Sequence, residues 1–112
     1  MSAPRLNVPL VLEQPQRQPD GMGGFRVRWA ALGTVWAAMR ARGGREVSGP
    51  VGRESAQHWE ITLRAAMPGD PRRPAPGQRL RMAGRVFRVL AVAESGPAGR
   101  LLVCQATEEV QT

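Results

Sequence analysis

The sequence predicts an all-β protein, a small antiparallel β-barrel or sandwich of about six strands with long loops. Apolar and polar residues alternate over several short segments, which is the period of a strand with one buried face. The chain contains 13 glycines and 10 prolines, which interrupt the pattern at short intervals and leave little room for long helices. With 112 residues the chain has the common size of one domain, so we expect residues 1–112 to form a single unit.

The N-terminal segment predicts a strand at residues 6–13. Leu10 and Leu12 fall on the same face by alternation. Pro9 has no N–H to donate to a ladder and is typical of an edge strand. Residues 14–24 are polar and end in Asp-Gly-Met-Gly-Gly, so we expect a loop that closes with a tight reversal.

The next segment predicts strand structure with one ambiguity. Residues 25–29 alternate cleanly, with two aromatic rings on one face and two arginines on the other. Residues 29–40 fit both helical and strand spacing, and Gly33 favours a break followed by a further strand. Residues 42–57 are polar and rich in glycine, so we expect a long loop with a short helical turn at residues 54–57.

The second half of the chain contains the clearest strand. Trp59, Ile61 and Leu63 alternate with polar residues over residues 58–64, so their side chains should point inward. The whole chain has only three Trp and two Phe. We therefore expect these five rings to anchor a core that is otherwise aliphatic.

A proline-rich loop and a hairpin follow this strand. Residues 67–78 contain four prolines, which favour an extended, stiff loop outside any ladder. Residues 79–93 predict a hairpin with a short turn at Ala83 and Gly84. After another reversal, residues 100–107 predict the last strand.

The charge of the chain is strongly positive. All 16 basic residues are arginine, against nine acids, which gives a formal net charge of +7 and a sequence pI near 11.7. Guanidinium groups attract polyanions and pair bidentately with phosphate, which indicates an acidic partner such as DNA. A GC-rich coding sequence would also favour arginine over lysine, although it explains the excess of positive charge less well.

The middle of the chain is the candidate binding surface. Residues 64–88 hold seven arginines and a single acid. Projected outward, these arginines would form a basic surface for nucleic acid or for an acidic protein ring. The alternative is a solvated face that binds nothing. The candidate contact residues are Arg42, Arg45, Arg53, Arg72, Arg73, Arg79 and Arg81.

Catalysis and metal binding are not expected. The chain has one histidine and one cysteine, and His58 with Glu60 supplies only two ligands on one strand face. No nucleophile or phosphate-loop motif is present, so we expect no enzyme activity, no cofactor and no metal. Cys104 fits a small buried residue of a strand. Neither a targeting signal nor a membrane span is visible, which indicates a soluble protein that is not secreted.

The order of features along nearly the whole chain resembles a known family. The residues that carry the resemblance are Asp20 with Gly23-Gly24, Trp29, Thr34 to Ala37, Gly44 and Glu46, His58 with Ile61 and Arg64, Arg79, Gly84-Arg85, Phe87, Val89, Val92, and finally Arg100, Leu102 and Cys104. Together they are similar to the phage head-tail joining family, whose members are also called head-tail adaptors, head closure proteins or stoppers. The sequence departs from the family pattern at residues 63–65, at Phe87, where Tyr is common, and in the proline-rich loop.

The resemblance implies a structural subunit of the head-tail connector of a tailed phage or phage-like particle. It implies a small β-barrel with long loops, assembled as a ring that closes the DNA-filled head and docks the tail. A hexamer is expected rather than a dodecamer. The expected neighbours are a portal or adaptor ring above, a tail terminator or tail tube protein below, and double-stranded DNA in the channel, with no membrane and no cofactor. GC-rich coding fits a prophage or a gene transfer agent, with the protein made in the bacterial cytoplasm.

A small-barrel nucleic-acid-binding module is the alternative function. The charge supports it, whereas the lack of aromatic residues regularly interleaved with arginine weakens it. In either case we expect function to lie in the loops at residues 40–57 and 67–78 and in the outward arginines.

Overall fold

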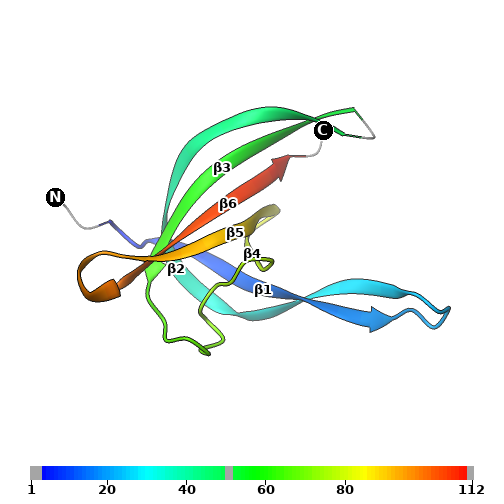
Figure 1. Ribbon diagram of the computed structural model, residues 1–112, viewed down its shortest axis with the longest axis horizontal. Helices are drawn as coiled ribbons and strands as arrows, with labels where there is room; N and C mark the ends of the chain where they lie inside the picture. The colour runs from blue at the N-terminus through cyan, green and yellow to red at the C-terminus, as the bar shows by residue number, and fades with distance from the viewer. Residues whose placement is uncertain (1–3, 50–51, 111–112) are drawn as a thin grey trace.

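The protein is an all-β barrel, as the sequence predicts. The computed structural model describes residues 4–49 and 52–110, and within them the side chains outside residues 44–56 and 109–110. Strands in this described part follow one another around a closed barrel in the order β1-β2-β3-β6-β5-β4, and all neighbours are antiparallel (Figure 1). The elements are β1 (Val8–Pro19), β2 (Phe25–Gly49), β3 (Gly52–Arg64), β4 (Arg79–Met82), β5 (Arg85–Ser95), the short 3-10 helix η1 (Pro97–Gly99) and β6 (Leu101–Val110).

The core fills the barrel with side chains from alternate positions of the strands. The inward alternation predicted around Leu10 and Leu12, and around Ile61 and Leu63, is confirmed, since all four are buried. Cys104 is buried too, as expected. The buried apolar residues are Leu10, Leu12, Val35, Ala37, Ile61, Leu63, Leu80, Phe87, Val89, Leu102, Cys104 and Ala106.

The aromatic residues contribute less to the core than the sequence predicts. Phe87 is fully buried and Trp59 packs against the core. Phe25, however, is 60% exposed and Trp36 is 56% exposed. The expectation that all five rings anchor the core is therefore wrong, because a narrow barrel is filled by branched aliphatic side chains and one ring.

Strand β2 is a single long strand that bends around the barrel. It pairs with β1 from Phe25 to Ala37 and then with β3 from Ala37 to Gly49, on its opposite edge. The predicted break at Gly33 is absent, since Gly33 lies inside β2. The strand predicted after it is confirmed, and the helical alternative for residues 29–40 is excluded.

Two segments predicted as loops are strands that project from the barrel. The first arm, residues 14–30, is the distal part of the β1–β2 hairpin. The second arm, residues 40–49 and 52–60, is the distal part of the β2–β3 hairpin. Both extend toward the right in Figure 1. The long loop expected at residues 42–57 and its helical turn are therefore wrong, and the loop expected from residue 14 begins only after Pro19.

The missed strands have a physical explanation in the first arm. Between Gln14 and Pro19 and between Phe25 and Ala30 the two strands pair only with each other among the described residues, because the pairing of β1 with β4 ends at Glu13. With solvent on both faces, no apolar period is required. The ladder itself is made by backbone hydrogen bonds, which the side-chain pattern does not report.

Three β-bulges shape the barrel. Leu32, Arg42 and Leu90 are each an extra residue opposite a regular strand. An extra residue reverses the alternation locally and re-aims the side chains next to it. After the bulge at Leu90 the inward face of β5 shifts by one residue, so Val92 instead of Ala91 packs against the core. This shift explains why β5 is apolar on both faces in the sequence.

The predicted β4–β5 hairpin is confirmed, and the proline-rich loop differs in shape from the prediction. Ala83 takes a positive φ of 53° in the two-residue turn, as such hairpins require. The loop between β3 and β4 stays outside the ladders, but consecutive turns fold it back instead of extending it. Asp70 organises it, since its N–H donates to the Met67 carbonyl at 2.9 Å and its own carbonyl accepts from the Arg73 N–H at 2.9 Å.

Candidate functional site

Arg79 and Arg81, both predicted contact residues, lie together over one carboxylate. The Nε of Arg79 donates to Glu13 at 2.7 Å, and the Nε of Arg81 donates to the other oxygen of Glu13 at 3.1 Å. The guanidinium of Arg79 also lies 4.1 Å from the centre of the Trp29 ring. These four residues form the Glu13 cluster, which ties β4 to the base of the first arm.

The electrostatics of the Glu13 cluster favour the charged carboxylate. The Glu13 side chain is only 8% exposed. Burial raises the pKa of Glu13, but the hydrogen bonds and charges of Arg79 and Arg81 outweigh burial and hold the pKa below its ordinary value of 4.5. Arg79 and Arg81 therefore each use a guanidinium N–H in a hydrogen bond within the subunit.

A second cluster, which the sequence did not predict, lies between β3, β5 and β6. The guanidinium of Arg85 donates to both oxygens of Glu108, at 2.7 and 2.9 Å, and the Trp59 indole N–H donates to the same carboxylate at 3.1 Å. Trp59 in turn meets the Phe87 ring edge to face, with centroids 5.8 Å apart. These residues form the Glu108 cluster, in which Arg85 holds the pKa of the Glu108 carboxyl below its ordinary value.

Arg72 and Arg73 have different roles in the loop between β3 and β4. Arg73 donates to the Ala66 carbonyl at 2.8 Å and lies 3.6 Å from a carboxylate oxygen of Glu94, so it fastens the loop to the barrel. Arg72 is more exposed, lies 3.7 Å from the Asp70 carboxylate, and packs its stem where Gly33 has no side chain. Of the two, only Arg72 presents its guanidinium mainly to solvent.

The remaining predicted contact residues lie on the second arm. Arg42 occupies a bulge and makes a 3.5 Å ion pair with Glu60. Arg45 lies in β2 and Arg53 in β3, but the side chains of these two lie outside the described residues. The structure therefore does not bring the seven predicted arginines into one patch: two meet at Glu13, two lie in the loop, and three are spread over the second arm.

The distribution of unpaired charge is uneven. The carboxylates whose side chains the structure describes all have a partner, with Glu13, Glu60, Asp70, Glu94 and Glu108 bonded to arginine and Asp20 to the backbone N–H groups of its turn. Several arginines have no ion pair with any of these carboxylates, and none of them is among the seven predicted contact residues. They are Arg5, Arg17, Arg26, Arg28, Arg40, Arg64 and Arg100, of which Arg17 lies over the Phe25 ring.

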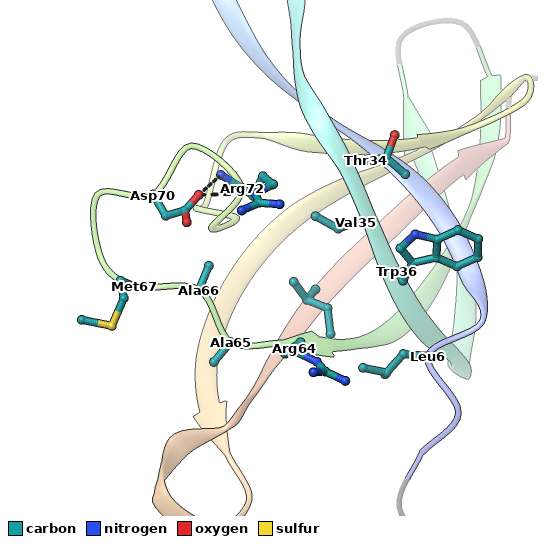
Figure 2. A pocket seen from close by; sticks show the side chains of 11 residues that line it. Leu6, Thr34, Val35, Trp36, Arg64, Ala65, Ala66, Met67, Asp70 and Arg72 are labelled. Atoms are coloured by element: carbon teal, nitrogen blue, oxygen red, sulfur yellow. Dashed lines mark hydrogen bonds and ion pairs between the residues drawn. The ribbon is translucent and has the colours of Figure 1, made fainter.

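A groove of about 630 Å³ opens beside β2. Thr34, Val35 and Trp36 lie on one side of it, and Ala66, Met67 and Asp70 of the loop lie on the other (Figure 2). Two of the residues that line the groove, Trp36 and Met67, have exposed side chains. Sequence reasoning missed this groove because it joins segments about thirty residues apart along the chain.

Residue types suited to metal binding or catalysis do not gather in the described part of the chain. It holds no group of three or more His, Cys, Asp and Glu side chains able to share a metal ion. His58 faces the Thr107 hydroxyl at 3.4 Å, and burial raises the pKa of the Cys104 thiol to about 12, which disfavours the reactive thiolate. Among the described residues no helix has the length and apolar character needed to cross a lipid bilayer.

The fold and these surfaces define an assembly protein, a small barrel that presents projecting strands, an apolar groove and exposed arginines. The family model for the phage head completion protein matches residues 1–109, and the chain belongs to that family. It is also similar to a chain in a solved structure described as the virion of a native gene transfer agent particle, with 47% sequence identity, a TM-score of 0.86, and coverage of 96% of this chain and 98% of that chain. Among curated proteins, none matches. The resemblance found in the sequence is confirmed, and both matches are to structural proteins of virions.

Proposed function

We propose that this protein is a ring-forming subunit of the head-tail connector of a tailed phage or gene transfer agent, which closes the DNA-filled head and docks the tail. The observation that carries the proposal is its family membership, together with 47% identity to a chain of a gene transfer agent virion over nearly the full length of both chains. The working assembly is a hexamer. It lies between a portal or adaptor ring and a tail terminator or tail tube protein, around double-stranded DNA.

The structure supports a role in binding and not in catalysis. A barrel with a radius of gyration of 15.5 Å and extents of 52 × 33 × 22 Å is long for its mass because of its arms. Two-stranded ribbons are marginally stable by themselves in water, so arms of this kind are expected to be covered by neighbouring subunits. We therefore assign the protein a structural role, which is to hold other proteins of the particle in place.

Of the predicted contact arginines, we assign partner binding to Arg72 and, on the second arm, to Arg42, Arg45 and Arg53. Arg73, Arg79 and Arg81 act mainly within the subunit, because their guanidinium groups are engaged by Ala66, Glu94 and Glu13. This division follows from a general rule, since a guanidinium that already donates to groups of its own subunit has fewer donors left for a partner.

Deletion of the gene and complementation test the function. Without the protein, we expect DNA-filled heads and separate tails in the electron microscope, and the wild-type gene should restore joined particles. Complementation with Arg72→Glu should give stable protein but fewer than a tenth of the joined particles, and Arg72→Lys should restore most of them. Normal particles from the deletion strain, or tight duplex DNA binding by a monomer with steep salt dependence, would contradict the proposal.

A further inference from the structure

The groove beside β2 lies where two strands of the barrel separate. The pairing of β2 with β3 begins at Ala37 and Leu63. Beyond Leu63 the chain turns away from β2, and the Ala65 N–H donates to the Arg100 carbonyl at 2.9 Å. Upstream of Ala37, β2 therefore has β1 on one edge and, among the described residues, no strand on the other (Figure 2).

The backbone of β2 offers hydrogen-bonding groups to this open edge. Pro9 pairs with Trp36. Because proline has no N–H, this is a non-hydrogen-bonded pair, and Trp36 directs its N–H and C=O away from β1. In an antiparallel ladder such pairs alternate, so Thr34, two residues before Trp36, also directs its N–H and C=O away from β1. An open edge with outward N–H and C=O groups is the template for addition of another strand.

The side chains that line the groove suit an apolar segment. Val35 and Leu63 belong to its lining and are themselves part of the core. Trp36 is 56% exposed and Met67 is 77% exposed at its rim. In Figure 2 these two side chains lie on opposite sides of the groove, and the apolar floor between them is formed by Val35 and Leu63.

The charge of the groove selects among possible occupants. Arg64 lines it and has no ion pair with any described carboxylate, whereas the carboxylate of Asp70 is already bound by Arg72. The free charge in the groove is therefore positive. The carboxylates whose side chains the structure describes all have partners within the subunit, so none of these is free to reach Arg64 from a second copy of the chain.

We propose that this groove binds an extended segment of a different protein of the particle, which adds as a strand to β2 at Thr34. The segment places apolar side chains over Val35 and Leu63 and a carboxylate on Arg64. The inference rests on the proposed function, because it names the kind of partner segment that a connector subunit would hold. It assigns a docking role to the 630 Å³ groove, which the sequence did not predict.

Site-specific photo-crosslinking in assembled particles tests the proposal. Position 36 is replaced by the photo-reactive amino acid benzoylphenylalanine, with position 67 as a second probe site if particles do not assemble with the first. After irradiation, peptide mass spectrometry should identify an extended, acid-bearing segment of another particle protein. In the same assay Arg64→Glu should lower the crosslinked fraction at least fivefold, and Arg64→Lys should retain it. The matched control Arg100→Glu changes an exposed arginine that does not line the groove and lies outside both arms, so it should leave the fraction unchanged.

The outcomes separate this inference from the proposed function. A crosslink to a second copy of the chain or to DNA overturns the strand-addition proposal, and so does the absence of any crosslink in particles that join tails normally. Those results leave the connector function standing. If the protein is absent from purified particles altogether, the proposed function itself is overturned.

Discussion

The Glu13 cluster joins β1 to β4 and the Glu108 cluster joins β5 to β6, and the two stabilise the barrel by different means. In the Glu13 cluster, two arginines of β4 share one carboxylate, and Trp29 lies under Arg79 outside the core. In the Glu108 cluster, one arginine binds the carboxylate twice, and Trp59 connects it to the buried Phe87. The first is thus a surface clamp at the base of an arm, while the second is an extension of the core.

The largest expected effect is a difference in the free energy of unfolding between variants that remove an aromatic ring from each cluster. Phe87→Ala removes a fully buried ring and should lower the free energy of unfolding by about 3–5 kcal/mol, whereas Trp29→Ala should cost on the order of 1–2 kcal/mol. Urea denaturation of both variants measures the difference. Equal losses would show that the Glu13 cluster is as much a part of the core as the Glu108 cluster.

A smaller effect distinguishes the carboxylates. Glu13→Gln and Glu108→Gln each place an amide N–H₂ among donors only, so each should lower the free energy of unfolding by about 1–3 kcal/mol. The loss at Glu13 should be the greater, because two guanidinium groups lose their anionic partner. The double variant should show additive losses, since the clusters share no residue, and strong coupling between them would refute this separation.

The smallest effect is a dependence of stability on pH. The pKa of Glu13 and the pKa of Glu108 are both lowered in the folded state by their arginines, so the unfolded chain binds more protons in acid. Their contribution is fully present above the ordinary value of 4.5 and is lost as pH falls through the lower folded values. Denaturation at a series of pH values should show this decline, and the double glutamine variant should show a flatter curve. An identical slope in that variant would contradict the assignment.

The sequence predicts the strands that have one buried face. Alternation identifies residues 58–64 and residues 79–82, because their side chains face core and solvent in turn. The arms have no such requirement, and their polar, glycine-rich sequences therefore indicate loops. Backbone pairing alone makes them strands.

The site residues follow the same division. The outward position of Arg79 and Arg81 follows from alternation along β4, but their partner Glu13 lies 66 and 68 residues away in the chain, and no local pattern reports such a contact. The importance of Arg64 depends on where β2 and β3 separate, which is a property of the closed barrel. Composition indicates a charged surface, whereas topology decides which charges remain free.

Strand β2 gives the molecule a mechanical property. One continuous backbone of 25 residues runs from the tip of the first arm to that of the second, held by β1 along one half and by β3 along the other. Antiparallel hydrogen bonds lie perpendicular to the strands, so tension along β2 is shared by many bonds in shear instead of breaking them one at a time. We therefore expect strain applied to one arm to be transmitted along β2 to the other.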